Sequence, residues 1–430
     1  MGCNELSLVE CAKHIVDNRG RTCPVGTLGR PLIATNCLRE ETLYPTYETI
    51  RFVSEETYQT WFRGHPQPND ILFVTKGSPG RVCLAPNPVD FCIAQDMVAI
   101  RADESKVYPR YLFAVLRSPE TRRRIEDMHV GTLIPHFKKG DFDKLYLPIP
   151  ARPAQMFIGD LYFELSARID LLRRTNGTLE AIAQALFKSW FIDFDPVRAK
   201  AEGREPEGMD AATAALFPSE FEESELGKIP KGWRVGCLGD ILIQRVERAK
   251  PSMLTAGLPY VPIECISPKS VFLCESLPGE QAQSSLTFFK KDDVLFGAMR
   301  PYFHKVCIAP FDGVTRTTAF VLQAKKGHRA FALFAAFDDS TVEFATTHSE
   351  GSTIPYAKWT SSLERKRTII PPATIAAQFE SLVTPLLESG MHNTTRSSLL
   401  TDLRDTLLPR LISGKLRITE AMEQVEEALT

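Results

Sequence analysis

The feature that most constrains the fold of this 430-residue chain is an internal repeat with a period of about half its length. Four short blocks and one Pro/Gln pair recur in the same order, displaced by 220 to 228 residues: 29–38 and 257–266, 70–73 and 293–296, 81–86 and 305–310, 131–138 and 351–358, Pro148/Gln155 and Pro371/Gln378. A long repeat decides the architecture before any single element does. The sequence therefore predicts two similarly folded units.

Each copy of the repeat is expected to begin with a part rich in strands. Short apolar runs such as 71–75 and 82–85 alternate with Gly and Pro, which is typical of a mixed β domain with some helix. Pro148, Pro150 and Pro153 then separate this part from the segment that follows. The overall composition, 43% hydrophobic and 24% charged, is that of an ordinary folded protein.

The segment after these prolines has the heptad pattern of a coiled coil. Two columns of residues alternate by four and three positions: Ile158, Leu165, Leu172, Leu179 and Leu186, and Tyr162, Ile169, Asn176, Ala183 and Trp190. This spacing predicts a seam about 33 residues long, on which a polar Asn176 fixes the register. An amphipathic helix packed on its own globular domain is the alternative.

The second copy carries a less regular helix. One seven-spaced column is Phe379, Leu386, Asn393, Leu400 and Leu407, and the expected companion column is Leu382, Ser389, Arg396 and Leu403. Pro385 and Gly390 within this span predict a kink or an interruption. Two helices of about 50 Å each, at 1.5 Å per residue, are expected to pair antiparallel and to form a pseudo-two-fold dimer within one chain.

The charge is unevenly distributed. The chain has a net charge of −2, but residues 201–225 carry eight acids and one arginine, and residues 420–427 carry four acids and no base. The rest of the chain is therefore basic. This distribution predicts a body that binds phosphate groups, with two acidic segments attached to it.

Sequence motifs for catalysis are missing. The chain has no phosphate-binding GxxxxGK[ST] loop, no HExxH and no methyltransferase motif, and its ten cysteines form no CxxC pair. Glu364 and Lys366 resemble the end of a nuclease site, but no nearby motif supplies their carboxylate partner. We therefore expect a non-catalytic chain without a metal site. The absence of a secretory signal and of an 18-residue apolar run predicts a cytoplasmic protein without a membrane partner.

Two stretches carry a family resemblance. LFKSWFIDFDPVRAK at 186–200, followed by LGKIPKGW at 226–233 and LGD at 238–240, resembles the central conserved region of type I restriction-modification specificity (S) subunits. LLPRLISGKL at 407–416 resembles the distal conserved region of the same family. The resemblance covers essentially the whole chain. The first copy departs from it, because it lacks a counterpart of Gly232-Trp233.

This resemblance implies an α+β protein with two β-rich target-recognition domains, joined by two long conserved helices in an antiparallel coiled coil. The implied divisions are a first recognition domain, a central helix, an acidic linker, a second recognition domain, a distal helix and an acidic C-terminal tail: 1–150, 151–200, 201–230, 231–370, 371–417 and 418–430. Each recognition domain would read one half of a split site on double-stranded DNA.

The resemblance also implies partner subunits. Two methyltransferase (M) subunits would dock on the chain and transfer a methyl group from S-adenosylmethionine to adenine. An ATP-driven restriction (R) subunit is a further partner that the resemblance allows, with magnesium as its cofactor; this chain itself would use no cofactor. Two other functions stay open: a magnesium-dependent nuclease that uses Glu364 and Lys366, and a coiled-coil scaffold without DNA contact.

The repeat sorts the candidate DNA contacts. Arg81 and Lys305 begin matched strands, and Lys138 and Lys358 follow matched loops, so we expect these recurring bases to bind phosphates. Basic residues that do not recur are expected to read the DNA bases, since two domains that read different sequences must differ there: Lys76, Arg300 and Arg316. A solvated or structural role is the alternative for each.

Aromatic residues gather where the first helix ends. Phe187, Trp190 and Phe191 lead into the acidic segment and are candidates for the interface with an M subunit, because interfaces are enriched in such side chains. Packing inside the chain is the alternative for Trp190, and we prefer it.

Overall fold

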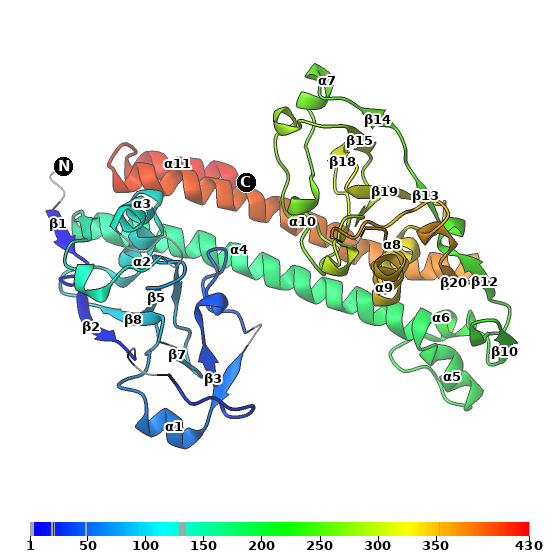
Figure 1. Cartoon of the computed structure of the whole chain (residues 1–430), viewed down its shortest axis with the longest axis horizontal. Coiled ribbons are helices and arrows are strands. Elements are labelled where there is room, and N and C mark those ends of the chain that lie inside the picture. The colour runs from blue at the N-terminus through cyan, green and yellow to red at the C-terminus, as the bar shows by residue number, and fades with distance from the viewer. Residues whose placement is uncertain are drawn as a thin grey trace. The chain divides into compact units, whose positions relative to one another are not determined.

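The computed structural model describes residues 4–429 except 19, 21, 48, 49, 94, 129–134 and 352. The chain separates into two compact units: unit 1 comprises Met1–Leu171 and Leu399–Thr430, and unit 2 comprises Leu172–Ser398 (Figure 1). These units divide both long helices, so they neither match nor exclude the domain limits expected at residues 150 and 370. In the described part of the chain, no helix is long and apolar enough to cross a membrane.

Unit 1 contains a four-stranded antiparallel sheet and a smaller three-stranded sheet. The order in the larger sheet is β2 (Ala12–Val16), β8 (Met97–Ala102), β5 (Ile71–Val74) and β6 (Val82–Leu84). The order in the smaller sheet is β4 (Arg51–Val53), β3 (Arg30–Ile33) and β7 (Cys92–Ile93). The unit also contains α1 (Glu55–Thr60), α2 (Pro109–Arg117), α3 (Pro119–Met128) and a pair of strands, β1 (Asn4–Ser7) and β9 (Tyr146–Ile149).

Unit 2 repeats this plan. Its four-stranded sheet has the order β13 (Leu242–Gln244), β19 (Ala319–Ala324), β16 (Val294–Gly297) and β17 (Val306–Ile308). The smaller sheet is β14 (Arg248–Ala249), β15 (Leu286–Phe289) and β18 (Gly313–Arg316). The other elements are α7 (Met253–Ala256), α8 (Arg329–Phe337), α9 (Asp339–Thr347) and the pair β12 (Arg234–Cys237) and β20 (Arg367–Ile370). The predicted repetition of the fold is confirmed.

A recurring aspartate explains one of the repeated sequence blocks. Asp70 accepts a hydrogen bond from the Gln67 backbone at 2.8 Å and pairs with Arg101 at 2.9 Å, directly before β5. In unit 2, Asp293 before β16 accepts from the Lys290 backbone at 2.8 Å and pairs with Arg245 at 2.8 Å. The two arginines come from different places in their sheets, so only the aspartate was visible as a repeat.

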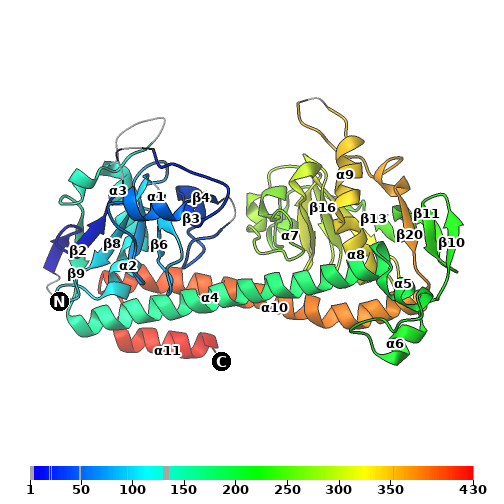
Figure 2. The same ribbon diagram turned by 90° about the horizontal axis from the view of Figure 1, so that it is seen from below.

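The two long helices pair antiparallel within each unit. In unit 1, Ile158 and Tyr162 of α4 (Arg152–Phe187) share a core with residues near the end of α10 (Ala373–Ile412), namely Leu407, Leu408 and Leu411. In unit 2, Asn176 of α4 donates to the Gly390 carbonyl at 2.9 Å and accepts from Asn393 at 3.0 Å. Figure 2 shows α4 and α10 side by side. The predicted coiled coil and the polar contact on its seam are confirmed.

The second seam column differs from the expected one. Leu382 and Ser389 are exposed, whereas six other residues seven positions apart are buried: Ala376, Val383, Gly390, Ser397, Arg404 and Leu411. Small and polar residues hide this column from a search for apolar heptads. Gly390 is required there, because an added Cβ would lie 2.1 Å from the Phe272 ring. The predicted interruption is wrong, since α10 runs for 40 residues with Pro385 exposed on its surface.

The two acidic segments are folded. The segment expected to be a tail, 418–430, contains helix α11 (Ile418–Leu429), because Ile418, Ala421 and Val425 give it an apolar face. The expected linker at 201–230 contains α6 (Ala211–Ala215) and the hairpin of β10 (Phe221–Ser224) and β11 (Gly227–Pro230), after α5 (Asp195–Ala201). Phe217 and Ile229 anchor this segment in the core of unit 2, while its eight acids are exposed.

Candidate nucleic-acid interface

Three segments meet at one end of the four-stranded sheet in unit 1, and we call this place loop junction 1. It consists of the loop between β5 and β6 (75–81), the turn before β8 (95–96) and the segment 135–138. The Thr75 and Lys76 backbone N–H groups donate to the Asp96 carbonyl, at 2.9 and 3.3 Å. Gly77 donates to the Pro135 carbonyl at 2.9 Å, and Phe137 donates to the Thr75 carbonyl at 2.9 Å.

Unit 2 builds loop junction 2 from the matched segments 298–305, 317–318 and 355–358. The Ala298 and Met299 backbone N–H groups donate to the Thr318 carbonyl, at 2.9 and 3.2 Å. Arg300 donates to the Pro355 carbonyl at 2.7 Å, and Ala357 donates to the Ala298 carbonyl at 2.8 Å. The two junctions thus share four backbone hydrogen bonds, which fix the loops in the same way whatever side chains they carry.

Most of the predicted DNA contacts lie at the junctions. Lys76 and Lys138 are exposed at junction 1, and Lys358 is exposed at junction 2, where Glu350 holds its ammonium at 2.6 Å. Arg316, exposed at the end of β18, directly precedes the turn at 317–318. The Arg300 Nε is buried and has no hydrogen-bond partner among the described residues. Residues 131–134 and 352 of the repeated block lie outside the described residues.

The side chains of Arg81 and Lys305 bind backbone carbonyls at two short helices, away from the exposed side chains of the junctions. Arg81 donates from Nη1 to the Leu38 carbonyl at 3.1 Å, directly after the short helix η1 (Thr35–Cys37). Lys305 donates from Nζ to the Ile263 carbonyl at 2.7 Å, at the start of the matched helix η5 (Ile263–Cys265). Both side chains therefore contact a backbone carbonyl at the matched short helix, at its opposite ends, which gives a structural reason for a basic residue at this position. The geometry therefore favours the structural alternative over phosphate binding for this pair.

Sequence reasoning missed several polar side chains at the junctions. At junction 2, the Tyr356 hydroxyl donates to the Thr317 carbonyl; burial raises the pKa of Tyr356, and the nearby Arg248 guanidinium opposes this shift. At junction 1, an open hollow is lined by Arg63, Gln95 and His136 together with Lys76. His136 and Tyr356 occupy matched positions after Pro135 and Pro355, so the alignment of the repeats contained the signal that would have found them.

The tips of the two hairpin loops differ most. Junction 1 carries the small residues 77–80, Gly-Ser-Pro-Gly. Junction 2 carries the short helix η7 (Pro301–Phe303) between Arg300 and His304. Tyr302 and Phe303 expose 50% and 45% of their surface. The two junctions therefore offer the same backbone frame with different side chains for recognition.

The nuclease alternative finds no support in the contacts of Glu364 and Lys366. Glu364 accepts from the Ser361 backbone at 2.6 Å, and Lys366 donates from Nζ to the Ser340 hydroxyl at 3.1 Å. Burial lowers the pKa of Lys366, and Asp338 opposes this shift. Over the described residues, no group of three or more His, Cys, Asp or Glu is placed to hold a metal ion.

The expected interface residues Phe187, Trp190 and Phe191 are buried in unit 2, with exposed fractions of 6%, 3% and 3%. The Trp190 ring lies 5.0 Å from the Phe217 ring and 5.9 Å from the Phe379 ring. Here α4 passes into a π-helical turn, η3 (Lys188–Ile192), which turns both Trp190 and Phe191 into the core. Intramolecular packing explains their position, and direct contact with another subunit would require their rearrangement.

Comparison with known proteins gives consistent likenesses. A family model described as the type I restriction modification DNA specificity domain matches residues 28–181. The type I restriction enzyme MjaIX specificity subunit of Methanocaldococcus jannaschii is 27% identical over 365 residues, which is 81% of this chain and 78% of the relative. The HindI specificity subunit of Haemophilus influenzae is 26% identical over 409 residues, 81% of this chain and 86% of the relative.

A solved structure has a similar fold. The crystal structure of a type I restriction-modification system S subunit from M. genitalium aligns with 96% of both chains at a TM-score of 0.57 and 13% sequence identity. At this identity the likeness concerns the fold alone, and it agrees with the repeated α+β plan described above.

Proposed function

We propose that the chain belongs to the family of type I restriction-modification specificity subunits and that its two loop junctions read the two halves of a split DNA target. The observation that carries this proposal is the pair of junctions, which share four backbone hydrogen bonds and differ in their exposed side chains. A shared backbone arrangement with different exposed side chains is suited to two domains that recognise different DNA sequences. The chain itself would recognise DNA, and the chemistry would take place on partner subunits.

The two kinds of DNA contact are assigned to different residues. Lys138 and Lys358 are exposed at matched positions and are proposed to bind phosphates, which position the protein without reading sequence. Lys76, Arg300 and Arg316 are proposed to reach base edges, where a bidentate arginine discriminates guanine by about 1–3 kcal/mol. Neutralising several phosphates would make binding depend strongly on salt.

The partners complete the proposal. We propose that two M subunits assemble with the chain and methylate adenine with S-adenosylmethionine, and that an R subunit using ATP and magnesium joins them. This chain would bind none of these cofactors. A cytoplasmic location is proposed with this role, because the DNA and the partner subunits are found there.

The long helices are proposed to set the spacing of the half-sites. Helices α4 and α10 are 36 and 40 residues long and pair antiparallel in each unit. A helix has a fixed rise per residue, so a paired helix acts as a ruler of fixed length. The separation of DNA half-sites follows protein geometry in the same way in other DNA-binding proteins.

The proposal is tested by mapping methylated adenines in cells that carry the chain with its M subunits. The methylated adenines are compared with those in cells whose chain has residues 240–360 replaced by the same region of a relative. We expect one half-site to change and the other to stay. A change of both halves would contradict separate reading. Cleavage of DNA by the purified chain with magnesium would favour the nuclease, and an assembled complex without salt-sensitive DNA binding would favour the scaffold.

A further inference from the structure

The tip of the hairpin loop in unit 2 exposes two adjacent aromatic side chains. Tyr302 and Phe303 lie between β16 and β17, and their ring centroids are 4.8 Å apart. Each leaves about half of its surface uncovered. Exposed neighbouring aromatics at the tip of a loop mark an interaction site, because their apolar surface is more stable when covered. The matched tip of unit 1 carries no aromatic residue among 77–80.

The backbone of this loop is held in an unusual conformation. Arg300 and His304, which flank η7, both have left-handed backbone angles, with φ of +52° and +51°. Residues other than glycine adopt this conformation when the surrounding structure imposes it. The Arg300 N–H bonds to the Pro355 carbonyl at 2.7 Å, and the His304 N–H bonds to the Pro301 carbonyl at 2.8 Å. The aromatic pair is therefore presented on a fixed loop.

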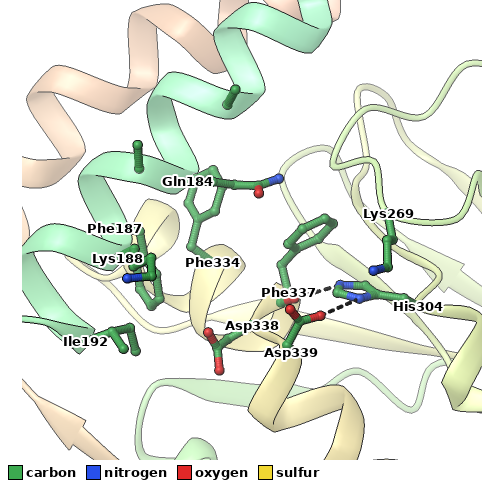
Figure 3. Close-up of a pocket in the computed structure, with 12 residues that line it drawn as sticks. Gln184, Phe187, Lys188, Ile192, Lys269, His304, Phe334, Phe337, Asp338 and Asp339 are labelled. Carbon is green, nitrogen blue, oxygen red and sulfur yellow. Dashed lines mark hydrogen bonds and ion pairs between the residues drawn. The ribbon is translucent and has the colours of Figure 1, made fainter. Parts of the chain in front are cut away.

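The side chain of His304 fastens the loop to the helices behind it. Its Nε2 lies 2.7 Å from the Phe337 carbonyl, so Nε2 carries the proton and donates (Figure 3). Its Nδ1 lies 3.3 Å from an Asp339 carboxylate oxygen, a contact that is attractive only when Nδ1 is protonated as well. Phe337 ends α8 and Asp339 begins α9. A cavity of about 460 Å³ adjoins the ring, so the hydrogen bond to the Phe337 carbonyl and the contact with the Phe337 ring, rather than close packing on all sides, hold His304.

We propose that Tyr302 and Phe303 enter the DNA of the half-site read by unit 2 and unstack one base step, and that His304 is the positioning residue that holds them. This inference rests on the proposed function. Apolar side chains inserted between base steps kink DNA and read its deformability without hydrogen bonds to bases. The same junction supplies Arg300 and Arg316 for the neighbouring base edges and Lys358 for a phosphate. This basic surrounding favours DNA over a protein partner.

The test uses the complete complex with M subunits and a duplex that carries the mapped target. 2-Aminopurine, whose fluorescence rises on unstacking, is placed at each position of both half-sites in turn. We expect one step in the half-site of unit 2 to brighten with the wild-type complex. The double variant Tyr302→Ala/Phe303→Ala should lose this signal and bind roughly 10- to 100-fold more weakly. Signals in the other half-site should not change.

A matched control removes exposed apolar surface elsewhere in unit 2. Met253 and Leu254 of α7 are strongly exposed, and the double variant Met253→Ala/Leu254→Ala should bind and brighten as the wild type does. If Tyr302→Ala/Phe303→Ala behaves like this control, the inference is wrong. If the variant loses M subunits on purification instead, the aromatic pair docks a protein, and the inference is also wrong.

His304 is tested by two substitutions. His304→Leu removes the hydrogen bond to the Phe337 carbonyl and should lose the brightening at the same step without lowering the melting temperature of the complex by more than a few degrees. His304→Asn keeps a donor and tolerates left-handed backbone, so it should restore part of the signal. Equal signals from both variants and the wild type would exclude a positioning role. A wild-type complex without sequence-specific binding would overturn the proposed function itself, which separates the two failures.

Discussion

The two hairpin loops form the most informative comparison within this chain. Residues 75–81 and 298–305 are held by the same four backbone hydrogen bonds, yet one tip is Gly-Ser-Pro-Gly and the other carries two exposed aromatics between left-handed residues. Backbone bonds tolerate almost any side chain, so a frame built from them can persist while its tip changes. Recognition can therefore diverge between the two units without a change of fold.

The largest predicted effect concerns the aromatic core of unit 2. Trp190→Ala removes a ring that contacts Phe217 and Phe379 and should lower the free energy of unfolding by about 3–5 kcal/mol. Trp190→Phe keeps an aromatic ring there and should cost less. Denaturant unfolding and co-purification with M subunits are measured together. Unchanged stability with lost association would show that Trp190 serves an interface instead.

A second pair of variants asks whether the Asp–Arg pairs before β5 and β16 stabilise their units equally. Asp70→Ala and Asp293→Ala each leave a partly exposed arginine without its buried carboxylate, and each should destabilise its unit by roughly 2–4 kcal/mol. Fluorescence reports the two units differently, because Trp190, Trp233 and Trp359 lie in unit 2 and Trp61 lies in unit 1. Similar losses from both variants are expected; a loss from only one would break the comparison.

Much of this architecture could be predicted from the sequence, because the repeat, the α4 heptads and the polar Asn176 are local patterns. The second seam column could not, since Gly390, Ser397 and Arg404 are buried by partners that the sequence does not name. The acidic segments looked like solvated linkers because charge dominates their composition. Phe217 and Ile229, which anchor one of them, are too sparse to form a periodic pattern.

The candidate site was predictable to a similar degree. Matched positions led to Lys138 and Lys358, and the search for basic residues that do not recur led to Lys76; all three are exposed at the junctions. Arg81 and Lys305 also contact backbone carbonyls, since recurrence marks shared structure as readily as shared function, and phosphate binding by this pair stays a prediction. Tyr302 and Phe303 were missed because they have no counterpart in the first copy, and the search followed basic residues only.

Two glycines on the paired helices should respond in opposite directions. An added Cβ at Gly390 would collide with Phe272, so Gly390→Ala should cost about 1–3 kcal/mol by overpacking. Gly177 of α4 faces open space, and Gly177→Ala should stabilise the helix by about 1 kcal/mol. Denaturant unfolding of both variants measures the difference. Stabilisation by both would mean that the seam around Gly390 is looser than the structure has it.

The smallest effect is a dependence of stability on pH. Burial lowers the pKa of His304, which faces Asp339, Asp338 and Lys269, and of His328, which lies near Arg234, Lys325 and Glu380. Below about pH 6.5 the unfolded state then binds more protons than the folded state. The free energy of unfolding should therefore be constant above this pH and should fall as the pH drops below it. In unit 1, burial lowers the pKa of His65 alone among the histidines with a resolved shift. Tryptophan fluorescence should therefore show the larger loss in unit 2. An equal or larger loss in unit 1 would contradict this assignment.

The most direct test of separate reading is a methylome of cells that carry single-residue variants of each junction. Arg300→Ala and Arg316→Ala should relax the base preference in one half-site, and Lys76→Ala should relax it in the other half-site only. Sequencing of all methylated adenines measures both halves in the same sample. Relaxation of both halves by any one variant, or of neither half by all three, would contradict the account.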